Sequence, residues 1–194
     1  MRKIDLGQGN GALRQNGDLP RHRLNRFASF SLATSTKDSL ISDQNQKRFV
    51  MAIHQFKTEI DIVATPERVW EVMRDLERWP EWTTSITKMT LLDPQPIALG
   101  TRVQVLQPEL QPAVWKFTVI EPDKGFEWAT GNFMLRMLAG HWITPTASGV
   151  KVTLTIDVSG WLGGYVARKY GDLTRQYMGV EARGLKARSE ASPR

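Results

Sequence analysis

The chain has 194 residues, of which 41% are apolar, and this size and composition suit one compact domain with an extension. It contains no cysteine, which excludes a disulfide framework and thiol chemistry and favours a cytoplasmic location. The formal net charge is +6, yet residues 51–194 carry seventeen Lys or Arg against sixteen Asp or Glu, so this nearly neutral part of the chain does not indicate a nucleic-acid-binding domain.

Residues 1–50 have the composition of a leader. They hold nine Lys or Arg, are rich in Gly, Asn, Gln and Ser, and show no sustained apolar periodicity. Ordering such a segment costs ~1–2 kcal/mol per residue with little apolar surface to offset it, so we expect it to be mostly disordered. A start of translation at Met51, an Arg- and Ser-rich targeting peptide, or a simple tail would each account for it. We favour the start at Met51, because the domain pattern begins five residues later.

The expected domain, residues 51–190, opens with a strand and two short helices. Apolar and polar side chains alternate over residues 56–64, which predicts a half-buried strand. Thr65 fits a helix N-cap, with Pro66 at the first helical position. Pro80 interrupts the helical spacing that follows, so a second short helix or turn is expected there.

A series of short strands follows, separated by turns rich in Gly, Pro and Asp. Short strands joined by such turns favour an antiparallel sheet. The segments expected to form these strands are 85–92, 101–106, 114–120, 125–130, 134–144 and 150–158.

A long helix, to about residue 187, is expected after the break at Ser159-Gly160. Its larger apolar side chains recur at steps of three and four and predict one buried stripe: Leu162, Val166, Tyr170, Leu173, Tyr177 and Val180. We therefore expect Leu173 and Tyr177 to face the sheet. Gly179 and Gly184 are unfavourable inside a helix and indicate a close contact or a bend.

Five segments carry a family resemblance: Ala64-Thr65-Pro66-Glu67-Arg68-Val69-Trp70, Trp79-Pro80-Glu81-Trp82, Gly140-His141-Trp142, Gly149-Val150-Lys151-Val152-Thr153 and Asp157-Val158-Ser159-Gly160. With these segments and this order of elements, residues 53–190 resemble the START/polyketide cyclase/Bet v 1-like superfamily, also called SRPBCC. The resemblance implies an α+β, helix-grip fold. In this fold a curved seven-stranded antiparallel sheet wraps around the long C-terminal helix, and two short helices follow the first strand.

The resemblance also implies an apolar cavity between the sheet and the last helix. Members of the superfamily bind lipids, sterols, polyketides, hormones or quinones. Some catalyse cyclisation or dehydration, and others act on partner proteins. The fold alone therefore does not select one function.

Candidate catalytic residues are few. His54 lies at the edge of the domain, and His141 lies in an expected strand beside Trp142. If Trp142 faces the cavity, strand alternation turns His141 away from it, so His141 is a weak candidate for a general base. Two isolated histidines and no cysteine do not suggest a metal site, and no cofactor is expected.

All seven tryptophans fall within the domain. They either fill a packed core or line the cavity with other large side chains. The residues expected to contact a ligand are Trp82, Trp115, Phe117, Trp128, Met134, Trp142, Tyr165, Tyr177 and Met178. Polar selectivity is expected from His141, Tyr165, Tyr177 or Arg136.

Three functions remain open at this point. The first is binding of an apolar or aromatic small molecule, lipid-, polyketide- or quinone-like, in the cavity. The second is an enzyme of the polyketide cyclase/dehydratase type, and the third is a protein-interaction or regulatory module with an exposed apolar patch near Trp161 and Leu162. No apolar run approaches the ~20 residues that span a membrane. The sequence does not indicate the oligomeric state.

Overall fold

The computed structural model describes residues 53–94 and 96–191. The predictions for residues 1–50, namely disorder and a start at Met51, lie outside the described residues and stay predictions.

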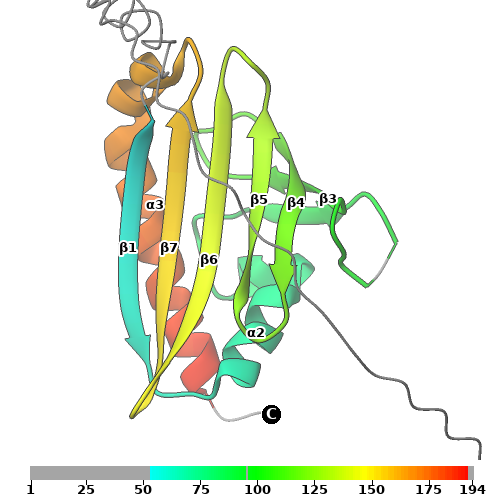
Figure 1. Ribbon diagram of the computed structural model, residues 1–194, viewed down its shortest axis with the longest axis vertical. Helices are drawn as coiled ribbons and strands as arrows, with labels where there is room; N and C mark the ends of the chain where they lie inside the picture. The colour runs from blue at the N-terminus through cyan, green and yellow to red at the C-terminus, as the bar shows by residue number, and fades with distance from the viewer. Residues whose placement is uncertain (1–52, 95, 192–194) are drawn as a thin grey trace, which may run out of the picture. The chain divides into compact units, whose positions relative to one another are not determined.

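The described residues form one seven-stranded sheet with the order β1-β7-β6-β5-β4-β3-β2, in which every neighbouring pair is antiparallel. The strands are β1 (His54–Ile62), β2 (Lys88–Leu91), β3 (Arg102–Leu106), β4 (Ala113–Glu121), β5 (Gly125–Gly131), β6 (Arg136–Thr146) and β7 (Gly149–Ser159). The helix α3 (Gly163–Glu190) lies along one face of this sheet, behind β1 and β7 in Figure 1. The predicted α+β, helix-grip fold is confirmed.

The two short helices after the first strand are also confirmed. In α2 (Pro66–Arg74), the hydroxyl of Thr65 accepts a hydrogen bond from the backbone N–H of Arg68 at 3.3 Å, so Thr65 is the N-cap. Pro66 occupies the first turn, where no backbone N–H is needed. The segment η1 (Leu76–Glu81) is a 3₁₀ helix that contains Pro80.

Strand alternation divides the sheet into an inner and an outer face. The inner residues of β1 and β7 face each other in register, with Ile60 opposite Val152 and Ile62 opposite Val150. On β6, His141 pairs with Leu154, a buried inner residue of β7. Its neighbour Trp142 belongs to the opposite, outer face. The hydrophobic core therefore lies between the inner face of the sheet and the helices.

The predicted stripe on the last helix is wrong in phase. The buried residues of α3 are Gly163, Gly171, Met178, Ala182, Leu185 and Ser189, whereas Leu173 and Tyr177 are only half-buried. The reason is that several small residues face the sheet. A Cβ at Gly171 would lie 3.4 Å from the ring of Phe56, so the large side chain at this contact belongs to β1 and not to α3. A pattern of large apolar residues cannot reveal a helix face built from Gly, Ala and Ser.

Gly184 allows the closest approach along α3. A Cβ placed on Gly184 would overlap the backbone oxygen of Trp82, a clash that only backbone movement relieves. At Gly179 the nearest atom to an added Cβ is Nη1 of Arg183 at 3.3 Å, at the end of a flexible side chain. The predicted close contact is therefore present at Gly184.

These two glycines give a matched test of the packing of α3. We expect Gly184→Ala to lower the free energy of unfolding by several kcal/mol, because α3 must move away from Trp82. Gly179→Ala should be neutral or stabilise the protein by up to ~1 kcal/mol, as alanine does in helices. Chemical denaturation of both variants measures the difference. Equal stabilities would contradict the close contact at Gly184.

Candidate functional site

A small cavity lies between the inner face of the sheet and α3. Its volume is about 60 Å³. Aromatic and aliphatic side chains dominate its wall, and the polar side chains that join them come from the strands, α3 and the segment after β3. The lining residues are Ile86, Val105, Gln107, Trp115, Trp128, Ala139, His141, Leu154, Thr155, Ile156, Met178 and Glu181.

His141 and Glu181 form a largely buried hydrogen-bonded pair on the wall of this cavity. Nε2 of His141 lies 2.8 Å from Oε1 of Glu181, and the pair joins β6 to α3. The side chains are only 6% and 14% exposed, respectively. His141 was a weak candidate only if Trp142 faced the cavity. In the structure Trp142 lies on the outer face, so strand alternation turns His141 inward.

The carboxylate sets the hydrogen-bonding role of the imidazole. With Glu181 ionised, Nε2 carries the hydrogen and donates it, so in the neutral ring Nδ1 is left with a lone pair. Nδ1 of His141 is buried and has no hydrogen-bond partner among the described residues. Nε1 of Trp128, another cavity residue, is likewise buried without a partner among them. Two residues on the cavity wall therefore each carry a buried ring nitrogen without a hydrogen-bond partner among the described residues.

Aromatic rings hold the imidazole in place. The ring of His141 stacks on Phe126 with centroids 4.6 Å apart and planes 21° apart. Trp79 and Trp128 approach it edge-on, at 5.4 Å and 5.7 Å between centroids. Trp79 is itself fixed, because its Nε1 donates to the backbone oxygen of Met73 at 2.9 Å. This packing restricts rotation of the imidazole and so preorganises the pair.

Three of the residues predicted to contact a ligand line the cavity: Trp115, Trp128 and Met178. Phe117 packs in the core beside Trp128, with ring centroids 5.5 Å apart. Trp142 lies on the outer face of the sheet.

The other predicted residues lie elsewhere in the domain. Met134 and Tyr165 are exposed, and Trp82 borders a different hollow. The hydroxyl of Tyr177 donates to the backbone oxygen of Pro108 at 2.5 Å, which ties α3 to the segment after β3. For these residues, as for Phe117 and Trp142, ligand contact stays an untested prediction.

The sequence reasoning missed Glu181 and Gln107. Glu181 lies one helical turn after Met178, on the side of α3 that meets the sheet, so the correct phase of the helix would have revealed it. Gln107 follows β3 in a loop, and no periodic signal identified it.

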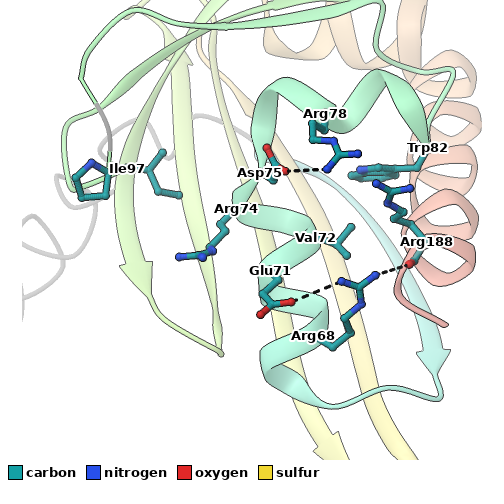
Figure 2. A pocket seen from close by; sticks show the side chains of 10 residues that line it. Arg68, Glu71, Val72, Arg74, Asp75, Arg78, Trp82, Ile97 and Arg188 are labelled. Atoms are coloured by element: carbon teal, nitrogen blue, oxygen red, sulfur yellow. Dashed lines mark hydrogen bonds and ion pairs between the residues drawn. The ribbon is translucent and has the colours of Figure 1, made fainter. Parts of the chain in front are cut away.

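A larger and more polar cleft lies outside this core (Figure 2). Its volume is about 490 Å³, and it is lined by Arg68, Glu71, Val72, Arg74, Asp75, Arg78, Trp82, Pro96, Ile97 and Arg188. Most of the arginines already have partners. Arg68 pairs with Glu71 and donates to the backbone oxygen of Arg188, while Arg78 and Arg188 both bind Glu81. These contacts join α2 and η1 to the end of α3. The arginines of the cleft are therefore explained by their structural role.

Hydrogen bonds from Arg78 hold the pKa of the Glu81 carboxyl below its ordinary value, with a further contribution from the charge of Arg188. Glu81 therefore stays ionised at neutral pH and neutralises part of the basic charge of the cleft.

Two further observations concern the described part of the chain. Between residues 53 and 191, with position 95 excepted, no group of three His, Cys, Asp or Glu side chains is placed to hold a metal ion. The same residues contain no helix that is long and apolar enough to cross a membrane. The absence of a metal or cofactor remains a prediction.

Solved structures share this fold at low sequence identity. Protein TTHA0849 from Thermus thermophilus superposes with a TM-score of 0.57 at 17% identity, covering 70% of this chain and 97% of that one. The Zhui aromatase/cyclase from Streptomyces sp. R1128 gives 0.58 at 12% identity, covering 72% and 94%. Ara h 8.0201 gives 0.55 at 11% identity, covering 71% and 98%. At these identities the similarity shows the fold alone.

Comparison with curated proteins gives a shorter match. The uncharacterized protein Rv2574 of Mycobacterium tuberculosis (strain ATCC 25618 / H37Rv) is 42% identical over 50 residues, which is 26% of this chain and 30% of that protein. The matched region thus spans less than a third of the relative. The model of the family described as polyketide cyclase / dehydrase and lipid transport matches residues 54–190, nearly the whole described domain. The chain belongs to this family, within the START/polyketide cyclase/Bet v 1-like (SRPBCC) superfamily.

Proposed function

We propose that this protein binds an apolar or aromatic small molecule between the sheet and α3, with His141 and Glu181 selecting its polar group. The observation that carries the proposal is the buried His141–Glu181 pair on an otherwise largely apolar wall. Taking an ionisable pair largely out of water costs free energy that its hydrogen bond offsets only in part, and such pairs are often found at functional sites. A core that only had to be stable would gain by replacing them with apolar residues.

The size of the cavity limits how a ligand binds. A volume of about 60 Å³ is well below the ~300–1,000 Å³ of typical sites for drug-sized ligands. Binding therefore requires the cavity to enlarge. Met178 and Gln107 have long, flexible side chains on its wall, and a change in their rotamers is the least costly way to open it. We expect compact ligands, with one or two rings, to bind before extended lipids.

The two unpartnered nitrogens suggest the chemistry of the ligand. A ligand hydroxyl can donate to Nδ1 of His141, and a ligand carbonyl can accept from Nε1 of Trp128. The rings of Trp115 and Trp128, 5.4 Å apart, favour a flat, aromatic body. Phenols, hydroxyquinones and aromatic polyketide fragments combine these features. This assignment and the cytoplasmic location are proposals.

An enzyme of the cyclase/dehydratase type is the second candidate, and the geometry of the pair favours it over a purely structural role. A carboxylate that holds one imidazole nitrogen leaves the other free to accept a proton, as in the Ser-His-Asp arrangement. Nδ1 of His141 would take a proton from an activated C–H beside a carbonyl, and Glu181 would stabilise the imidazolium that forms. In a dehydration, the same proton would then leave with the departing hydroxyl as water.

Filling the cavity tests the binding site. Ala139→Val adds two methyl groups at the wall, so the affinity for a panel of one- and two-ring phenols should fall at least tenfold while the fold is kept. Ala129→Val makes the same chemical change on β5, whose alternation places it on the outer face, and should leave affinity unchanged. Isothermal titration measures both. Equal affinity in the two variants would place binding outside the cavity.

The hydrogen-bonding role of His141 is directly observable. We expect neutral His141 to be the Nε2–H tautomer, because Nε2 donates to Glu181. The ¹⁵N chemical shifts of its ring report this, and the chain has only three histidines, so assignment is simple. Glu181→Gln should change these shifts, whereas the shifts of His54 should stay as they are. An Nδ1–H tautomer in the unmodified protein would contradict the proposed role of Nδ1.

Catalysis has its own test. If the protein turns over a polyketide-like substrate, His141→Gln should lower kcat by ~10²–10⁴-fold, the usual contribution of a general base. His54→Gln, at the start of β1, should leave kcat unchanged. Turnover that is unaffected by His141→Gln would remove the second candidate and leave the binding proposal intact.

A further inference from the structure

Large apolar side chains are exposed together at one end of the domain. They are Phe133, Met134, Trp161, Leu162 and Tyr165, called here the apolar tip. Phe133 is 76% exposed, Trp161 70% and Tyr165 61%. Single exposed apolar residues are common, but a group of this size is typical of a surface that binds another protein or a membrane.

The apolar tip comes from two chain segments held against each other. The turn between β5 and β6 and the turn between β7 and α3 lie at the same end of the sheet (Figure 1). The backbone N–H of Leu162 donates to the backbone oxygen of Met134 at 2.9 Å. Gly160, at φ +99°, lets the chain pass so close that an added Cβ would lie 2.6 Å from the same oxygen.

Hydrogen bonds within the turn between β5 and β6 also stabilise it. The side-chain oxygen of Asn132 accepts from the backbone N–H of Met134 at 2.8 Å, and the N–H of Asn132 donates to the oxygen of Leu135 at 2.8 Å. The fold therefore presents the apolar side chains on a fixed base.

Basic residues accompany the apolar tip. Arg136 begins β6, and Arg168 and Lys169 lie one turn along α3 from Tyr165. Residues 128–171 contain a single acidic residue, Asp157, whose carboxylate accepts a hydrogen bond from Gln55 at 2.8 Å. Nζ of Lys169 lies over the rings of Tyr165 and Tyr170, at 5.8 Å and 5.1 Å from their centroids. Its contacts with Tyr170 and Tyr165 raise the pKa of Lys169, which keeps it charged.

We propose that the apolar tip inserts into the interface of a bilayer that contains anionic lipids, so that the domain docks peripherally on a membrane. Phe, Trp and Leu beside Arg and Lys are the combination that the interface favours, because the rings enter the headgroup boundary while cations bind lipid phosphates. The excess of positive charge fits an anionic lipid surface, whereas an ordinary protein interface depletes lysine at its core.

The inference is independent of the ligand proposed above, because the apolar tip and the cavity share no residue. Either proposal therefore survives failure of the other.

Vesicle co-sedimentation of the full-length chain tests the proposal. We expect wild-type protein to bind vesicles of phosphatidylcholine with about 30% phosphatidylglycerol at least tenfold more strongly than pure phosphatidylcholine, with binding that weakens as salt rises. Phe133→Ser combined with Leu162→Ser should reduce the partition coefficient on anionic vesicles at least tenfold. Val63→Ser with Leu99→Ser removes two side chains that are 70% and 72% exposed elsewhere, and should bind like wild type.

A second pair separates the local charge from the net charge. Arg168→Glu with Lys169→Glu should reduce binding to anionic vesicles, whereas Arg74→Glu with Lys88→Glu makes the same net change at exposed positions away from the apolar tip and should reduce it far less. Every variant retains residues 1–50, so their basic charge is constant. Equal effects of the two pairs, or undiminished binding after Phe133→Ser with Leu162→Ser, would overturn the proposal. Failure of wild type to bind vesicles would do the same. Circular dichroism confirms that each variant is folded.

Discussion

The close approach of α3 to the sheet determines how much space remains inside this domain. Small residues make it possible: Gly171 against Phe56, Ala182 in the core, and Gly184 against the backbone of Trp82. Between these contacts, Met178 and Glu181 border the cavity, and Glu181 reaches His141 on β6. The small residues allow the helix to pack near the sheet, and the side chains of Met178 and Glu181 fill part of the space that remains. The volume of about 60 Å³ follows from that arrangement.

The His141–Glu181 pair uses the same close approach. A hydrogen bond of 2.8 Å between a strand and a helix needs both elements fixed, and the rings of Phe126 on β5 and Trp79 on η1 hold the imidazole in place. An ionised partner makes such a bond worth ~1.5–3 kcal/mol, which offsets only part of the cost of burying the two groups. This balance supports the proposed role of the pair in ligand binding.

Much of the fold could be predicted from the sequence, since it rests on local signals. Alternation identified the strands, Thr65 and Pro66 marked the start of α2, and glycine or proline marked the turns. Two longer-range features could not be predicted. The side of β6 that faces the helix depends on the register with β5 and β7, so His141 and Trp142 could not be told apart. The buried face of α3 depends on how near the sheet lies, which a stripe of large residues does not report.

The candidate site was accordingly predicted only in part. Trp115 and Trp128 were found because large rings on neighbouring inner strands converge whatever the details of the helix. Glu181 was missed because a glutamate in a long polar helix reads as solvent-exposed until the helix phase is known. Met134 was expected to add an apolar lining and Tyr165 a polar contact, yet Met134 lies in the turn between β5 and β6, Tyr165 lies in the first turn of α3, and both side chains are exposed.

The inner cavity and the arginine-lined outer cleft differ in what a ligand would have to displace. In the outer cleft, Arg68, Arg78 and Arg188 already bind carboxylates or a helix carbonyl, and solvent screens their charges. An anion entering there competes with existing partners for little gain. On the wall of the inner cavity, Nδ1 of His141 and Nε1 of Trp128 have no partner among the described residues, so a hydrogen bond to either atom would displace no protein partner. A ligand in the smaller cavity would therefore add hydrogen bonds without displacing existing partners, although the cavity must open to admit it.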